Sequence, residues 1–167
     1  MLSFTTGLFA QQYSFHYYGT ERGLTNLAVK SMFQDRAGFL WLGTENGIFR
    51  FDGDRFQPYG EREGMPDNIG PSFGEAPDGT LLVGSTEGLF RLVADRFERV
   101  PMPGATLVKP YAGISNDGAG HTYLVTDRGP LVLTISGPER TWYVNAVPVP
   151  AAVTASISSV FARKDVV

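Results

Sequence analysis

The feature that most constrains the fold of this chain is an internal repeat with a period of 41 residues. Thr44, Ser85 and Thr126 are spaced by this period, and glycines recur with it in all three copies. The segment Phe39–Phe51 (FLWLGTENGIFRF) closely matches Thr80–Leu92 (TLLVGSTEGLFRL). Each copy holds short apolar runs separated by turn glycines, and a period near 40 with this content is typical of a four-stranded propeller blade. The sequence therefore predicts an all-β fold, a partial β-propeller.

The repeat also predicts the blade boundaries. We expect three blades, each with strands A to D in chain order, at residues 28–59, 69–100 and 111–147. The register extends beyond them in both directions. Tyr13–Tyr18 aligns with the last strand of a blade, and a segment beginning at Thr154 aligns with the first strand of a fourth. We therefore expect residues 11–167 to form one partial propeller, in which three full blades are flanked by single strands of incomplete blades and no substantial helix occurs.

Composition narrows the function classes. The 12 Phe, 7 Tyr and 2 Trp supply large side chains for packing between stacked sheets. The net charge of -3, without any cluster of Lys and Arg, argues against nucleic acid or an anionic membrane as a partner. Because the chain has no cysteine, disulfides, thiol nucleophiles and cysteine-ligated metals are excluded.

The first ten residues differ from the rest of the chain. They are uncharged and mostly apolar, they end in Ala10, and two glutamines follow. Such a run resembles the end of a secretory signal peptide, so we interpret residues 1–10 as a truncated signal peptide and expect export. No segment of the sequence reaches the roughly 18 consecutive apolar residues of a membrane span.

The segment from Gly23 to Phe56, with the run Phe39-Leu-Trp-Leu-Gly-Thr-Glu-Asn-Gly at its centre, resembles the two-component regulator propeller repeat. The resemblance is strongest in the first blade, good in the second and faint in the third. It implies a periplasmic propeller that forms the sensor region of a bacterial hybrid histidine kinase or related receptor. It also implies that a membrane helix and a kinase or diguanylate cyclase domain follow, so the chain is expected to be the amino-terminal piece of a longer sensor or a truncated reading frame.

No group of residues in the sequence predicts catalysis. His16 and His121 lie in different parts of the repeat, where packing or surface positions explain them better than a metal site or an acid–base pair. The run Asp52-Gly-Asp54 lacks the alternating carboxylates and the distal Glu of an EF-type calcium loop, so we interpret it as a turn. We therefore predict no catalytic residue, no metal and no cofactor.

Recognition is expected where the loops vary. In an antiparallel blade the D–A and B–C connections share one face of the disc, and here the D–A connections differ in length and content. Variable loops on a repetitive scaffold are where binding usually resides. The candidate ligand contacts are the polar residues of these connections: Arg22, Asn26, Glu45, Asn46, Arg62, Asp67, Asn68, Glu87, Asp127 and Arg128.

Two functions remain open at this point. The favoured one is a non-catalytic module that senses an unknown small molecule or glycan, or mediates an interaction, within a periplasmic receptor. The alternative is a propeller-fold lyase or glycosidase that acts on a polysaccharide or a cyclic peptide. Because unpaired strand edges invite association, we also expect Tyr13–Tyr18 and Thr154–Ala162 to contact the remaining blades of a receptor or a second copy.

Overall fold

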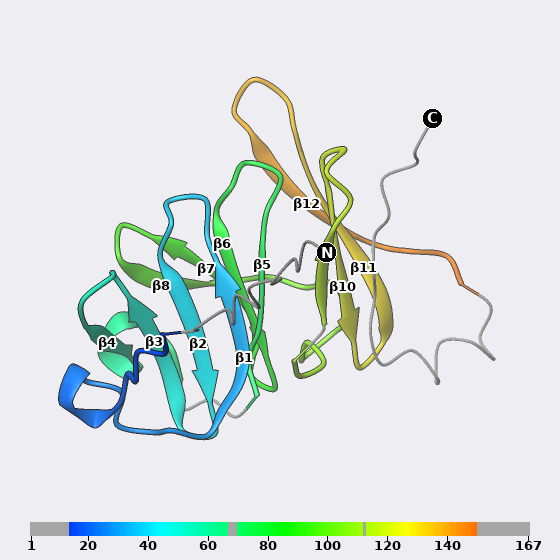
Figure 1. The fold of residues 1–167 in the computed structure, drawn as a ribbon. Coiled ribbons are helices and arrows are strands. Elements are labelled where there is room, and N and C mark those ends of the chain that lie inside the picture. The colour runs from blue at the N-terminus through cyan, green and yellow to red at the C-terminus, as the bar shows by residue number, and fades with distance from the viewer. Residues whose placement is uncertain (1–13, 67–69, 112, 150–167) are drawn as a thin grey trace, which may run out of the picture.

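The computed structural model describes residues 14–66, 70–111 and 113–149. In these residues twelve strands form three four-stranded antiparallel sheets, each in simple chain order (Figure 1). Blade 1 contains β1 (Val29–Gln34), β2 (Leu40–Thr44), β3 (Gly47–Phe51) and β4 (Phe56–Tyr59). Blade 2 contains β5 (Ser72–Glu75), β6 (Leu81–Ser85), β7 (Gly88–Val93) and β8 (Arg96–Val100). Blade 3 contains β9 (Ile114–Asn116), β10 (His121–Thr126), β11 (Gly129–Ser136) and β12 (Thr141–Ala146).

The expected all-β fold with three four-stranded blades is thus confirmed. The helical content of the described residues is two single 3₁₀ turns, η1 (Thr20–Arg22) and η2 (Glu61–Glu63). Each 3₁₀ turn ends in a glycine in the left-handed conformation, Gly23 or Gly64, which keeps the 41-residue register. None of the described helices is long and apolar enough to cross a lipid bilayer.

The expected strand over Tyr13–Tyr18 is wrong for the residues that can be described. Residues 14–18 are not in a strand, and a strand needs a neighbour whose backbone groups it can pair with. Instead, the ring of Tyr18 packs edge-on against Phe51 and Phe56, with centroids 5.2 and 6.5 Å away. The proposed signal peptide at 1–10 and the fourth-blade segment from Thr154 lie outside the described residues.

The first strand of blade 3 is shorter than expected and interrupted. Val108 forms an isolated bridge with Thr126, and the Lys109 N–H donates to the Val125 carbonyl. Regular pairing resumes only at Ile114. The intervening Pro110 has no N–H to donate, and Tyr111 has a φ of 68°, so the chain leaves the sheet there.

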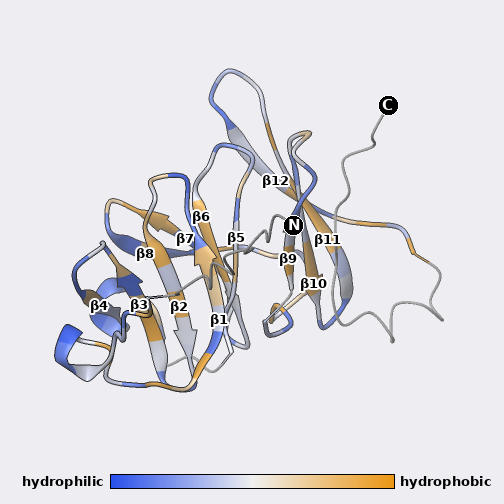
Figure 2. Cartoon of the chain, viewed as in Figure 1, coloured by the Kyte–Doolittle hydropathy of each residue, from blue (hydrophilic) through white to orange (hydrophobic). Residues whose placement is uncertain are grey.

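Successive blades stack face to face, and their apolar strands lie in the interior of the stack (Figure 2). The stack of blades 1 and 2 is aromatic, with Trp41, Tyr59 and Phe97 all buried. The stack of blades 2 and 3 is aliphatic, with Leu82 and Leu124 at its centre. Strands β2, β6 and β10 therefore hold the core.

Hydrogen bonds from the A strand of one blade to the segment before the A strand of the next align the blades. The Ser31 hydroxyl donates to the Pro71 carbonyl at 2.7 Å, and Ser72, 41 residues later, donates to the Lys109 carbonyl at 2.7 Å. The strands approach closely because Gly43 faces this contact: a β-carbon there would collide with the Ser31 hydroxyl and the Pro71 ring. The repeat therefore encodes the spacing between blades as well as the blades themselves.

Candidate functional site

The hydroxyl residues that define the repeat shape the B–C turns. Thr44, Ser85 and Thr126 are almost fully buried at the end of the second strand of each blade. Each hydroxyl oxygen accepts a hydrogen bond from the backbone N–H two residues later, at 3.1–3.2 Å. The hydroxyls of Thr44 and Thr126 also donate to the carbonyl of the glycine that opens the next strand. Five candidate residues sit in these turns: Glu45, Asn46, Glu87, Asp127 and Arg128.

The D–A connections run beside these turns, as the antiparallel order predicts. Before blade 1, the Asn26 side chain accepts from the Ala28 N–H at 2.9 Å, and the Ala28 carbonyl accepts from the Glu45 N–H at 3.1 Å. The Glu45 carboxylate pairs with Lys30 at 2.7 Å and raises the pKa of that ammonium group. The structure therefore brings Asn26 and Glu45 together at one corner of this face.

A second corner lies at blade 3. The Asp127 carboxylate accepts hydrogen bonds from the Thr106 N–H at 3.0 Å and the Thr106 hydroxyl at 2.9 Å. These bonds, the backbone one first, lower the pKa of Asp127. The carboxylate thereby fastens the connection between blades 2 and 3 to the B–C turn of blade 3, which is a structural role.

Of the other candidates in the D–A connections, Arg22 pairs with a residue outside these corners. Arg22 pairs with Asp54 at 2.6 Å, and Asp54 belongs to the C–D turn of blade 1. Arg62 lies exposed in η2. Asp67 and Asn68 lie outside the described residues. Within the described ranges, no group of three His, Asp or Glu side chains is placed to hold a metal ion, and ligand binding by the ten candidates stays a prediction.

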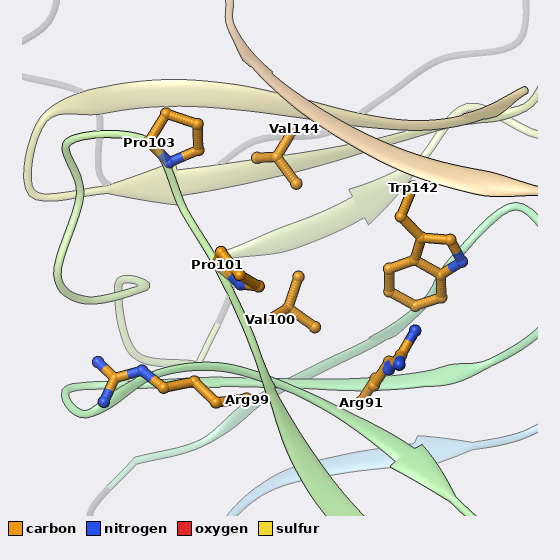
Figure 3. A pocket seen from close by; sticks show the side chains of 7 residues that line it. All are labelled: Arg91, Arg99, Val100, Pro101, Pro103, Trp142 and Val144. Atoms are coloured by element: carbon orange, nitrogen blue, oxygen red, sulfur yellow. The ribbon is translucent and has the colours of Figure 1, made fainter.

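The structure also contains a pocket that the sequence did not predict. It has a volume of about 240 Å³ and lies between blade 2 and blade 3, beside the connection that joins them. Figure 3 shows Arg91 beneath Trp142 at one end, Arg99 directed away from Trp142 at the other, and Val100 between them. Pro101, Pro103 and Val144 complete the wall.

The pocket exists because the facing sides of blades 2 and 3 lack the rings that fill the corresponding space between blades 1 and 2. There, Trp41 packs edge-on against Tyr59 and Phe97, with ring centroids 4.9 and 6.0 Å away. The strand pairing shows which residues occupy the equivalent positions one blade later. They are Leu82, Val100 and Val144. Three aromatic rings are thus replaced by three aliphatic side chains, and the space is only partly refilled by Trp142.

Two of these replacements were visible in the sequence, because Leu82 and Val100 follow Trp41 and Tyr59 by 41 residues. The third was not. Strand β11 is eight residues long, and its hairpin to β12 shifts Val144 and Trp142 out of the 41-residue frame. The pocket could therefore be found only from the strand pairing.

The pocket carries positive charge. The Arg91 guanidinium lies 5.1 Å from the centroid of the Trp142 ring and pairs with Glu98 at 2.9 Å. Arg99 is exposed and forms no ion pair with any residue in the described part of the chain. Two arginines against one nearby carboxylate leave this site with one uncompensated positive charge.

Comparison with known proteins agrees with this architecture. Residues 23–46, which contain β1 and β2, match the family model described as two component regulator propeller. Among solved structures, the chain is similar to the extracellular domain of the putative hybrid two component system BT3049 from B. thetaiotaomicron. The identity is 23% and the TM-score 0.56, over 86% of this chain and 21% of that one.

No curated protein matched the chain. At 23% identity the structural likeness shows the fold, and the chain spans about a fifth of that extracellular domain. The resemblance found in the sequence of blade 1 is confirmed by the family model. The chain therefore has the fold of a stretch of β-propeller, and residues 23–46 in its first blade match the two component regulator propeller model.

Proposed function

We propose that the chain is a non-catalytic ligand-sensing or interaction module of a bacterial two-component signalling receptor, acting in the periplasm. The observation that carries the proposal is the match of residues 23–46 to the two component regulator propeller. The similar fold of an extracellular domain from a putative hybrid two component system supports it.

The arrangement of the described residues also supports a binding role. The blades form a rigid scaffold because their turns are fixed by buried hydroxyls and their faces by buried apolar strands. The connections between blades differ from one another, and one of them borders a pocket lined by arginine, tryptophan and proline. A few polar groups in a mostly apolar cavity are typical of small-molecule sites.

A ligand screen with a chemical readout tests this proposal. The purified 167-residue chain is heated with single organic acids, monosaccharides and oligosaccharides, and the unfolding temperature is recorded. A ligand present at 100 times its Kd stabilises a protein by about 2.7 kcal/mol, which raises the Tm of a chain this size by roughly 5–10 °C. We expect a saturable rise for a subset of compounds, each recovered chemically unchanged.

The recovery step separates the two functions that the sequence left open. Each compound that raises the Tm is incubated with the chain and then analysed by mass spectrometry. Cleavage or elimination products would show a lyase or glycosidase and overturn the non-catalytic proposal. The absence of any saturable Tm rise across the panel would count against ligand sensing.

A further inference from the structure

We propose that the pocket between blades 2 and 3 binds a small organic carboxylate that carries a single ring. The inference rests on the packing of the blades and not on the proposed signalling role. Its failure would therefore leave that role standing, and its success would not by itself establish it.

The size of the pocket sets an upper limit on the ligand. A cavity on the order of 150 Å³ suffices for benzene, while sites for drug-sized molecules span roughly 300–1,000 Å³. The volume here is about 240 Å³. It matches one six-membered ring with a short substituent.

The walls favour a ring. Trp142, Pro101 and Pro103 present flat apolar surfaces, and Val100 and Val144 lie between them. Aromatic side chains pack favourably against other rings in stacked and edge-on geometries. An apolar ring would therefore replace water against most of this surface.

The charges favour a carboxylate. Arg99 lines the pocket without an ion pair among the described residues, and Arg91 lines it with only part of its guanidinium engaged by Glu98. Guanidinium groups bind carboxylates through paired, charge-assisted hydrogen bonds. A monoanion would neutralise the uncompensated charge of the site.

The neighbouring interface provides a template for this pairing of ring and carboxylate. Arg50 occupies between blades 1 and 2 the position that Arg91 occupies one blade later. Its guanidinium pairs with the Asp95 carboxylate at 2.6 Å and lies 5.2 Å from the centroid of the Tyr59 ring, and the Tyr59 hydroxyl donates to Asp95 at 3.0 Å. The protein itself thus fills this space with a ring and a carboxylate.

At the matching positions, blades 2 and 3 supply neither group. Val100 stands where Tyr59 stood, and the C–D turn of blade 3 presents Arg140, which faces Asp78 at 3.9 Å. A ring-bearing carboxylate would take the place of the Tyr59 ring and the Asp95 carboxylate. The ligand class follows from this substitution.

Fluorine NMR with 4-fluorobenzoate tests the inference on the full 167-residue chain. We expect saturable broadening of the ligand signal. Losing a charge-assisted hydrogen bond weakens binding by about tenfold or more, so Arg99→Gln should bind at least that much more weakly. The neutral analogue 4-fluorobenzyl alcohol, which keeps the ring, should lose a similar factor. Arg55→Gln, which changes an exposed arginine beside β4 of blade 1, is the matched control and should bind like the wild type.

A variant that fills the pocket makes the test independent of charge. Val100→Phe places a ring at the position equivalent to Tyr59. It should abolish the binding of 4-fluorobenzoate while keeping or raising the Tm of the chain. If that variant does not fold, Val144→Phe fills the same space from the facing strand. Equal binding of the neutral analogue, unchanged binding by a folded pocket-filled variant, or no binding of 4-fluorobenzoate would each overturn the inference. Calorimetric titration with glucuronate tests whether the pocket accepts a sugar ring as well as an aromatic one. If Val100→Phe abolishes glucuronate binding, the pocket accepts ring-bearing carboxylates of both kinds. If glucuronate binding is unaffected by that change, the sugar acid binds elsewhere, which contradicts its inclusion in the ligand class.

Discussion

Replacing Trp41 with alanine should remove the centre of the stack between blades 1 and 2. Its side chain is fully buried, and its ring lies 4.9 Å from Tyr59 and 6.0 Å from Phe97, measured between centroids. The indole Nε1 also donates to the Asp35 carboxylate at 2.7 Å. Trp41 therefore contributes both packing and a hydrogen bond to the turn that precedes its own strand.

The magnitude follows from these two contributions. Truncating a buried aromatic side chain to alanine costs about 3–5 kcal/mol, through lost burial and the cavity left behind. The hydrogen bond to a charged acceptor accounts for about 1.5–3 kcal/mol when only that bond is removed. Trp41→Phe, which keeps a ring but removes the N–H, should accordingly fall between the wild type and Trp41→Ala.

Urea unfolding followed by far-UV circular dichroism measures these differences. The unfolding free energy is taken from the midpoint and the slope, since a changed slope would signal a change in the unfolded state. Trp142→Ala is the matched control, because Trp142 is only partly buried and borders a pocket; its loss should be smaller. A cost below about 1 kcal/mol for Trp41→Ala, or equal costs for both tryptophans, would refute the assignment of Trp41 to the centre of the interface.

Three further predictions concern turns, pH and strand edges. Gly64→Ala should destabilise the chain more than Gly38→Ala in the same urea assay: both glycines have φ near 90°, but only at Gly64 would the new β-carbon collide with a backbone carbonyl. The hydrogen bond from Tyr59, followed by that from an arginine, lowers the pKa of Asp95, so its stabilisation is present at pH 7 and is lost as the pH falls through that lowered value. Asp95→Asn should therefore flatten the fall in stability between pH 7 and about pH 3, and an unflattened profile would contradict the pairing. Light scattering across a concentration series should show association through the open edges, and a concentration-independent monomer would contradict it.

The repeat predicted the blades because its period fixes where buried strands and turn glycines recur. It also predicted which connections share a face, since Asn26 and Glu45 are both hydrogen-bonded to Ala28, as antiparallel order requires. It does not predict the direction of the Arg22 side chain, which pairs with Asp54 of the C–D turn. Repeat register locates backbone positions, while the direction of a long side chain depends on its neighbours in space.

The pocket could not be predicted from the sequence, for a related reason. The hairpin that extends blade 3 breaks the 41-residue frame, so Val144 could not be aligned with Phe97 before the strand pairing was known. The replacement of Tyr59 by Val100 was visible, but a single smaller side chain does not predict a cavity, because neighbours can close around it. The pocket is lined by the smaller residues of two blades, Val100 in β8 and Val144 in β12, acting at one place.

The stacking of successive repeats as blades is the central claim on which the interface cores and the pocket depend, and a cysteine cross-link tests it most directly. The chain has no cysteine, so introduced pairs report without background. A β-carbon at Gly74 in β5 would lie 3.1 Å from the Ile114 Cβ in β9, close to the roughly 3.5–4.5 Å of disulfides. Gly74→Cys with Ile114→Cys should oxidise to an intramolecular disulfide, whereas Gly74→Cys with Ser115→Cys, on the opposite face of β9, should not. Failure of the first pair to cross-link within one chain, or equal cross-linking of both, would contradict the stacking of blades 2 and 3.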